Sequence, residues 1–405
     1  MHIFLSRPRR CPFLLAHSPI LLTGYPQRSE YRPRNQLHKQ AGVRPNFHIH
    51  RAFLVLKCTQ LTMAPAPKNN ALPKPDEQTV DSILRPSGWD DYIGQDNVKR
   101  NLKIILDAAR MRGEAVDHLL FYGQAGLGKT TLANLVAKEM NLPIRITTGP
   151  AIEKMGDLAA VLSNLEDKDI LFIDEIHRLN KIVEEVLYPA MESRKLHIVI
   201  GKGAGARTIS LDLPAFTLIG ATTRMNLLSE PLRSRFGATF RLDYYNHPDI
   251  EAILARSAKI LGVKATPGAI AVLARASRFT PRIANRLLKR ARDYVEVHKL
   301  KEITEDVARK TLEVLEVDPL GLEVHDRMIL ETIIDKFGGG PVGVNTIAAS
   351  LNEDRDVVEN VYEPYLMKLG LIRRTSAGRV AEPLAFEHLK RPPTGEAGKP
   401  GKSLF

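Results

Sequence analysis

The sequence has 405 residues but only two cysteines, Cys11 and Cys58, and both lie in its first 62 residues. The other 343 residues therefore offer no thiol for a disulfide, a zinc–thiolate site or a cysteine nucleophile. No run approaches the roughly 20 apolar residues of a membrane helix, so we expect no membrane partner. With 44% apolar and 26% charged residues, wholesale disorder is excluded. The length predicts a soluble protein of two or three domains.

The positive charge is unevenly distributed. The net charge is +12, but residues 1–62 hold ten basic residues against one acid, Glu30, whereas the rest holds 48 basic and 45 acidic residues. Nucleic-acid contact by the body of the chain must therefore come from local basic patches. Residues 1–62 show no helical or strand period, and we interpret them as a disordered extension before a natural start at Met63. A secretory signal or an organelle transit peptide is the alternative. Residues 63–82 are predicted to be a linker.

A phosphate-binding loop follows the first apolar strand. The run Leu119–Tyr122 precedes Gly123–Thr130, which reads Gly-Gln-Ala-Gly-Leu-Gly-Lys-Thr, and a helix-forming stretch follows. Strand, G-x-x-x-x-G-K-[ST] and helix together predict a P-loop, in which backbone N–H groups and the helix N-terminus surround phosphates. Lys129 is expected to reach the β/γ-phosphates and Thr130 to ligate Mg²⁺. A plain glycine-rich turn is the alternative.

Further strands supply candidate catalytic groups. Ile170–Ile173 ends in Asp174-Glu175, where a carboxylate beside a P-loop can hold Mg²⁺ and its neighbour can activate water. A third apolar run ends in Thr222-Thr223, either of which could sense the γ-phosphate. The alternatives are exposed turn carboxylates and an ordinary strand end.

The C-terminal half adds three further elements. Residues 196–200 and 207–211 alternate with period two around a glycine-rich turn and predict a β-hairpin with an apolar face of Ile198, Ile200 and Ile209. It either docks a partner or packs on its own domain. Residues 246–318 read as four helices. Residues 319–390 read as three helices and a short two-stranded wing, a winged helix, which contacts either DNA or protein.

Together these motifs resemble one family. The P-loop, the string Asp-Glu-Ile-His-Arg-Leu from Asp174, Ile-Gly-Ala-Thr-Thr-Arg from Ile219 and Thr-Pro-Arg-Ile-Ala-Asn-Arg from Thr280 closely resemble the RuvB family, the AAA+ motors of bacterial Holliday-junction branch migration. The resemblance covers residues 84–389. It implies an α/β P-loop AAA+ ATPase domain (83–245), a small all-α lid (246–318), a C-terminal winged-helix DNA-binding domain (319–390) and a disordered tail (391–405).

The resemblance also implies residue roles. Glu175 and Arg235 would be catalytic, Glu175 as general base and Arg235 as an arginine finger offered to the next subunit; by sequence alone, Arg235 could equally be solvated. Thr130 and Asp174 would hold Mg²⁺. ATP would be bound by Leu84, Arg85, Gly126, Gly128, Lys129, Thr130, Thr131, Glu192, Ser193, Arg194, Arg235, Tyr245 and Arg282. DNA would be contacted by Arg355, Arg374 and Arg379.

The function implied is an ATP-dependent DNA translocase that drives Holliday junction branch migration in recombination and repair. It would act in the cytoplasm as a homo-hexamer on double-stranded DNA, with RuvA bound through hairpin 196–211 and with the RuvC resolvase. Another AAA+ machine, such as a clamp loader or a protein remodeler, is the main alternative. A non-hydrolytic nucleotide switch is a further one, which Glu175 and Arg235 disfavour.

The chain departs from the family pattern at several positions. Gln124-Ala125 replaces two prolines in the P-loop, and Phe279 replaces a glycine before Thr280. Ser193-Arg194 follows Glu192 where the family has an acid and an aromatic residue, and Ala377 replaces an arginine of the wing. We expect ATP binding to survive, because the glycines and Lys129 remain, whereas Phe279 is expected to shift Arg282 slightly.

Overall fold

The computed structural model describes residues 77–200 and 207–392. The predictions for the extension 1–62, the start at Met63, most of the linker 63–82, the hairpin turn and the tail lie outside these residues. Within the described part, no helix is long and apolar enough to cross a membrane.

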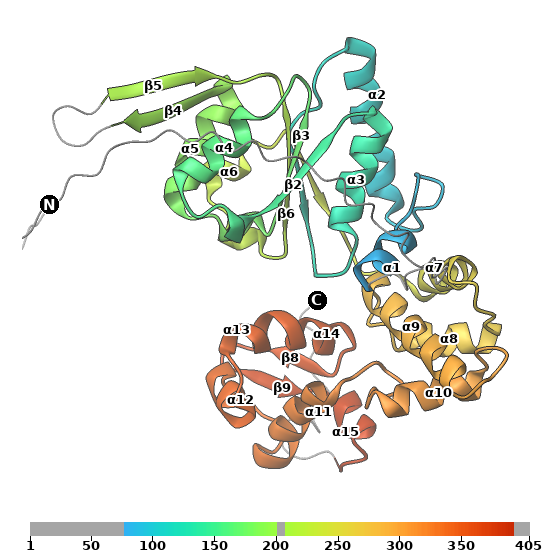
Figure 1. The fold of residues 1–405 in the computed structure, drawn as a ribbon. Helices are drawn as coiled ribbons and strands as arrows, with labels where there is room; N and C mark the ends of the chain where they lie inside the picture. The colour runs from blue at the N-terminus through green and yellow to red at the C-terminus, as the bar shows by residue number, and fades with distance from the viewer. Residues whose placement is uncertain (1–76, 201–206, 393–405) are drawn as a thin grey trace, which may run out of the picture. The chain divides into compact units, whose positions relative to one another are not determined.

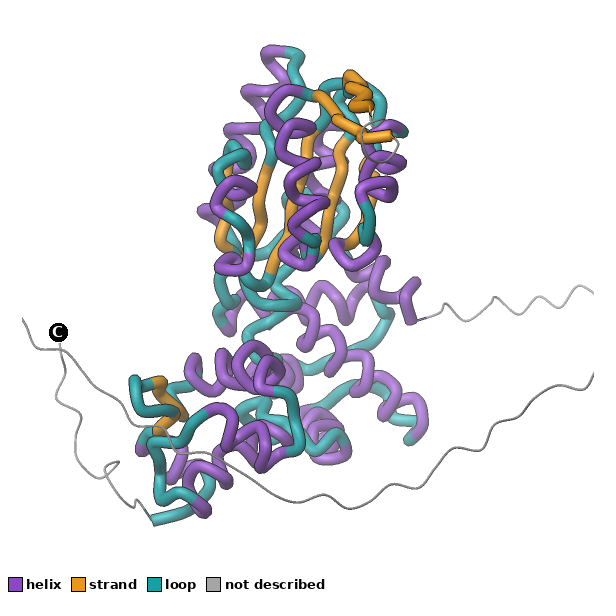
Figure 2. The backbone as a smooth tube through the Cα atoms, turned by 90° about the vertical axis from the view of Figure 1, so that its left-hand side faces the viewer, coloured by secondary structure: helices purple, strands orange, loops and turns teal. Residues whose placement is uncertain are grey.

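The first domain is built on a parallel sheet of five strands in the order β2-β3-β6-β1-β7 (Figures 1 and 2). The strands are β1 (Leu119–Tyr122), β2 (Ile144–Thr148), β3 (Ile170–Asp174), β6 (Thr217–Thr222) and β7 (Ala238–Arg241). Because successive strand residues face opposite sides, Ile170 and Phe172 enter one apolar core while Leu171 and Ile173 enter another. Both faces of the sheet are therefore buried at its centre, where β1, β3 and β6 are largely apolar and buried.

Helices cover the two faces. The core on one side includes α2 (Asp96–Arg112) and α3 (Lys129–Met140), and the core on the other includes α4 (Met155–Ser163) and α5 (Lys181–Ser193). Short helices follow the ends of β2, β3 and β6, namely η1 (Gly149–Ala151), η2 (Ile176–Arg178) and η4 (Met225–Leu227), and α6 (Glu230–Arg233) comes after η4. The predicted hairpin is present as β4 (Lys195–Ile200) and β5 (Arg207–Asp212).

The predicted lid is helical. It contains α7 (His247–Ile260), α8 (Pro267–Arg275), α9 (Pro281–Val297) and α10 (Glu305–Val314). Each helix begins after Asn or Thr, whose side-chain oxygen accepts a backbone N–H of the first turn, as at Asn246, Thr266, Thr280 and Thr304. Helix α1 (Glu77–Leu84) contacts α7.

The C-terminal domain is a winged helix. It comprises α11 (Val324–Glu331), the π-helical segment η5 (Thr332–Lys336), α12 (Val344–Leu351), α13 (Arg355–Val357), the π-helical η6 (Val358–Tyr362), α14 (Glu363–Lys368), the wing strands β8 (Ile372–Arg374) and β9 (Arg379–Ala381), and α15 (Pro383–His388). Three helices are predicted before the wing, and the third of them corresponds to residues 355–368. It is widened at η6, just before Pro364, which has no N–H to donate inside a helix.

Candidate functional site

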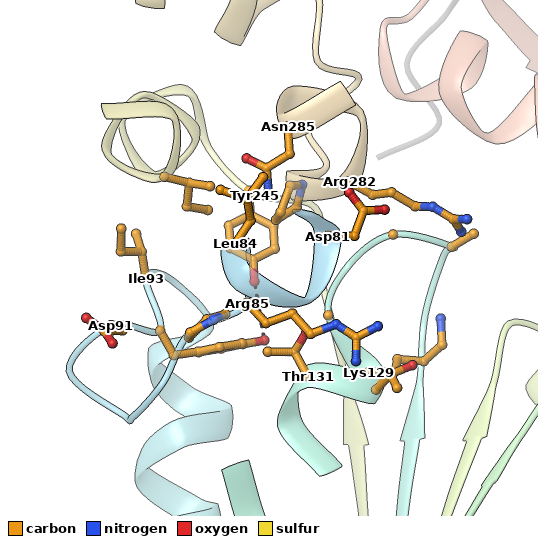
Figure 3. A pocket seen from close by; sticks show the side chains of 18 of the residues that line it. Asp81, Leu84, Arg85, Asp91, Ile93, Lys129, Thr131, Tyr245, Arg282 and Asn285 are labelled. Carbon is orange, nitrogen blue, oxygen red and sulfur yellow. Dashed lines mark hydrogen bonds between the residues drawn. The ribbon is translucent and has the colours of Figure 1, made fainter. Parts of the chain in front are cut away.

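A cavity of about 430 Å³ lies at the carboxyl ends of the sheet strands and is closed on the other side by the lid (Figure 3). Most of the predicted nucleotide ligands line it: Leu84, Arg85, Gly126, Gly128, Lys129, Thr130, Thr131, Tyr245 and Arg282, together with Asp174 and Glu175. The fold thus brings together residues that lie up to about 200 positions apart in the sequence. This is where ligands bind in open α/β sheets.

The P-loop has the backbone geometry that its glycines permit. Gly126 and Gly128 have φ of 82° and 99°, values that L side chains rarely adopt. A Cβ on Gly126 would also lie 3.0 Å from the Cβ of Arg282. Helix α3 begins at Lys129, so its N-terminus points its free N–H groups toward the cavity. Gln124-Ala125 leaves this geometry intact.

Three of the cations that line the cavity have no acidic partner among the described residues, whereas a fourth, Arg256, lies 3.9 Å from Asp91. The Nζ of Lys129 donates to the carbonyls of Gly123 and Gln124, at 2.8 and 2.9 Å. Burial lowers the pKa of Lys129, although Asp174 and Glu175 oppose this. Within the described residues, no carboxylate lies within ion-pair distance of Lys129, Arg85 or Arg282. Three cations without counter-ions around a curled backbone favour an anionic ligand such as a polyphosphate.

Two oxygen groups converge beside the P-loop. The Thr130 hydroxyl donates to Oδ2 of Asp174 at 3.2 Å, while Oδ1 of Asp174 accepts the N–H of Glu175 at 2.9 Å. A hydroxyl and a carboxylate at this separation form a donor set that suits Mg²⁺, which takes few protein ligands and keeps several waters. The residues present therefore fit the expected metal.

The backbone turns at Glu175, so its side chain points in a different direction from that of Asp174. Its φ of 51° turns the chain sharply between β3 and η2, and the side chain is 38% exposed and lines the cavity. Its Oε2 lies 3.4 Å from Nε2 of His177. Thr223 also lines the cavity, whereas its neighbour Thr222 is buried and contacts His177. Of the two candidate sensors, the structure therefore brings Thr223 to the site.

A lid arginine, Arg256, holds the segment Leu84-Arg85 that lines the cavity. Nη1 and Nη2 of Arg256 donate to the carbonyls of Leu84 and Arg85, each at 3.2 Å. Opposite, the hydroxyl of Tyr245 donates to the Leu127 carbonyl and accepts from the hydroxyl of Tyr92, both at 3.3 Å. Burial is the largest cause that raises the pKa of Tyr245 to about 12. This phenol therefore remains a neutral hydrogen-bonding wall.

Phe279 replaces the expected glycine at a position with φ of 55°, where glycine would be unstrained. Its ring lies 5.0 Å from that of His247 and 6.1 Å from that of Tyr365, and this packing offsets the backbone cost. Its carbonyl accepts the N–H of Tyr245 at 3.1 Å. Arg282 still lines the cavity from the first turn of α9, and Figure 3 shows it approaching the P-loop from the side opposite Arg85.

Arg235 belongs to a separate cluster outside the cavity lining. Its Nη2 donates to Glu192 at 2.9 Å, its Nη1 donates to the Pro231 carbonyl at 2.7 Å, and its guanidinium lies 4.9 Å from the centre of the Tyr188 ring. Glu192, Ser193 and Arg194, predicted to bind nucleotide, end α5 here rather than at the cavity. A nucleotide in this chain's own cavity is thus not in contact with these four residues.

The predicted DNA-binding arginines surround two glutamates. Arg355 pairs with Glu359 at 3.3 Å, Arg374 pairs with Glu363, and Arg379 bonds to both glutamates at 2.6 to 3.1 Å. The side chains of Arg355 and Arg374 are 58% and 48% exposed, whereas that of Arg379 is 9% exposed. In this conformation Arg355 and Arg374 can meet a phosphate. Arg379 would first have to leave its carboxylates.

The hairpin is divided between core and surface. Leu196 is buried with α5, whereas Ile209 and Leu211 are exposed, and Ile198 pairs across the strands with Ile209. The side chain of Ile200 lies outside the described residues. The hairpin therefore packs on its own domain at Leu196, while β5 exposes apolar side chains.

Several lining residues were not predicted, among them Tyr92, Ile93, Ile253, Arg256 and Asn285. Arg256 and Asn285 come from the lid, and no local motif marks them. The pair Tyr92-Ile93 directly precedes Gly94, which has φ of 75°, and an apolar pair before such a turn is the one sequence signal that could have identified them.

Family models match most of the chain. The model of the Holliday junction DNA helicase RuvB P-loop domain matches residues 84–242, that of the RuvB AAA lid domain matches residues 245–318, and that of the RuvB C-terminal winged helix domain matches residues 319–390.

Individual proteins and solved structures that resemble this chain belong to the same family as the matching models. The Holliday junction branch migration complex subunit RuvB of Dehalococcoides mccartyi is 56% identical over 317 residues, which cover 78% of this chain and 91% of that protein. The solved structure of the Thermotoga maritima RuvB Holliday junction branch migration motor has a TM-score of 0.71 and 48% identity, covering 76% of this chain and 99% of its own. A mutant form of it has a TM-score of 0.70, with 48% identity and coverage of 76% and 98%.

Proposed function

This chain belongs to the RuvB family of AAA+ P-loop ATPases, and from that premise we propose that it is the ATP-driven motor subunit of Holliday junction branch migration. The observation that carries the proposal is the cavity in which Lys129, Asp174 and Glu175 meet a lid arginine, Arg282. We divide the motor into an ATPase domain at 83–245, a lid at 246–318 and a winged helix at 319–390.

The substrate of the cavity is ATP. The P-loop amides and Lys129 bind the β- and γ-phosphates, Arg85 and Arg282 add charge from two sides, and Leu84 and Tyr245 line the wall. Mg²⁺, held by Thr130 and Asp174, would neutralise phosphate charge. Glu175 accepts a proton from a water whose oxygen attacks the γ-phosphorus, and the bond from that phosphorus to the ADP oxygen breaks. The products are ADP and inorganic phosphate.

Arg235 completes the site of a neighbouring subunit. Its cluster lies outside the cavity lining of its own chain, so Arg235, Glu192, Ser193 and Arg194 reach a nucleotide only across a subunit boundary. An arginine supplied in trans to the γ-phosphate is worth 10³–10⁵ in rate. This supports an assembly in which neighbouring subunits share their sites, and we propose that it is a homo-hexameric ring.

The partners are proposed from the family, and two surfaces of the chain support them. The winged helix contacts the backbone of double-stranded DNA and of Holliday junctions through arginines, which position without reading sequence. The exposed apolar residues of β5 bind RuvA, and the complex acts in the cytoplasm with the RuvC resolvase in recombination and repair.

The test is ATP-dependent dissociation of a synthetic four-way junction with and without RuvA. The wild-type chain should dissociate it, Glu175→Gln should retain ATP without turnover, and Arg235→Ala should bind ATP but hydrolyse it at least 10³-fold more slowly. Mixing Arg235→Ala with Glu175→Gln subunits is the matched control, since some mixed interfaces restore a complete site. Normal hydrolysis by Arg235→Ala alone would refute the trans site.

A further inference from the structure

A buried histidine connects the strand that carries Thr223 to the catalytic glutamate. His177 lies in η2, two residues after Glu175, and its side chain is only 5% exposed. Its Nδ1 lies 2.9 Å from the hydroxyl oxygen of Thr222, and its Nε2 lies 3.4 Å from Oε2 of Glu175. One ring thus contacts the end of β6 on one side and Glu175 on the other.

The hydrogen bonds around the ring have a defined direction. The Thr222 oxygen already accepts the N–H of Arg224 at 2.9 Å, so its own hydrogen is free to be donated to Nδ1 of His177. A carboxylate oxygen can only accept, so the 3.4 Å contact is favourable only when the nitrogen that faces Glu175 carries a hydrogen. The order is therefore Arg224 N–H to Thr222, Thr222 O–H to His177, and His177 Nε2–H toward Glu175.

The hydrogen on Nε2 is present whatever the charge of the ring, whereas the bond to Thr222 reverses when the ring is protonated. If the imidazole is neutral, the single hydrogen on Nε2 satisfies both contacts. If it is protonated, Nδ1–H donates to the second lone pair of the Thr222 oxygen, and Nε2–H still faces Glu175. In both states only Oε2 of Glu175 is engaged by the ring, which leaves Oε1 for the attacking water.

We propose that His177 is a positioning residue that fixes the orientation of Glu175 according to the position of the β6 end. Thr223 lines the cavity and is followed by Arg224, whose N–H begins the chain of hydrogen bonds. A displacement of Thr223 by a γ-phosphate therefore reaches the carboxylate through the hydrogen bond between Thr222 and His177 and the 3.4 Å contact of His177 with Glu175. The proposal rests on the role of Glu175 as general base given above.

The test uses two replacements that keep different halves of the imidazole. In His177→Asn the amide occupies the place of Nδ1, so the contact with Thr222 is kept and the donor to Glu175 is lost. In His177→Gln the amide reaches the place of Nε2, so the donor is kept. We expect kcat for ATP to fall about tenfold or more in His177→Asn, and to fall by less in His177→Gln, which keeps the donor but loses the contact with Thr222. The affinity for a fluorescent ATP analogue should be unchanged in both.

A double-mutant cycle tests the connection to β6. Thr222→Val keeps the shape of the side chain but removes the hydroxyl, and it leaves the Arg224 N–H without its acceptor. In the wild-type background it should lower kcat, whereas in the His177→Asn background, where Glu175 is already released, it should change kcat by less than twofold. The His177→Asn background thus shows how much kcat changes because the Arg224 N–H has lost its acceptor. Subtracting that change leaves the effect that passes through His177.

All assays use the full chain with RuvA and junction DNA, and thermal unfolding is measured alongside. Equal losses in His177→Asn and His177→Gln, or an equal effect of Thr222→Val in both backgrounds, would show a packing role and overturn the proposal. Glu175→Gln is assayed in parallel. If Glu175→Gln is inactive while His177→Asn keeps wild-type kcat, the positioning role fails and the motor function stands. If Glu175→Gln hydrolyses ATP normally, the assigned base itself is wrong.

Discussion

The nucleotide cavity and the winged-helix domain both gather basic side chains, but these have opposite partners. In the cavity, Lys129 bonds to neutral carbonyls, and no described carboxylate pairs with Arg85 or Arg282. In the winged helix, Arg379 is held by two carboxylates. A cation without a counter-ion is available to an incoming anion, whereas a buried ion pair contributes to the fold only while both members are present.

The largest loss of stability is expected on replacing Arg379, the arginine that is paired with two carboxylates. Arg379→Leu leaves Glu363, which is fully buried, with Arg374 as its remaining ion-pair partner. Breaking a buried pair costs about 3–5 kcal/mol, so the winged helix should lose most of its stability in urea while ATP affinity is unchanged. Arg373→Leu, an exposed arginine of β8, is the control. If Arg379→Leu left unfolding unaltered and weakened DNA binding alone, Arg379 would instead be a direct phosphate contact.

The opposite result is expected at Lys129. Its removal breaks only bonds to carbonyls, so Lys129→Ala should unfold within a few degrees of the wild type. The affinity for a fluorescent ATP analogue should nevertheless fall at least about 100-fold, because a buried charge-assisted contact to phosphate is lost. Lys103→Ala, an exposed lysine of α2, serves as the control. Tight ATP binding without Lys129 would mean that the P-loop amides suffice.

The smallest effects belong to the two exposed arginines of the winged helix. Arg355→Ala and Arg374→Ala should each weaken DNA binding about equally for all sequences. Each should also reduce the slope of log K against log salt concentration by about one unit. Fluorescence anisotropy at several salt concentrations on two unrelated duplexes measures both quantities. A loss confined to one of the duplexes would indicate base reading and contradict this assignment.

The sequence predicted the site better where chemistry is local than where it depends on packing. The P-loop and Asp174-Glu175 combine a motif with a strand end, and both lie where predicted. Strands β2 and β7 were not predicted, because their short, half-exposed segments show little apolar patterning. The partners of a side chain were also hidden: nothing near Arg379 in the sequence reveals that Glu359 and Glu363 enclose it.

The bonds from Lys129 to two loop carbonyls have a kinetic consequence. The lysine already holds the loop in its curled form, so ATP only has to exchange phosphate oxygens for carbonyl oxygens and need not reshape the backbone. The P-loop then needs little reorganisation between the first encounter with ATP and the bound state. Rearrangement of the P-loop should therefore contribute little to the barrier for ATP association.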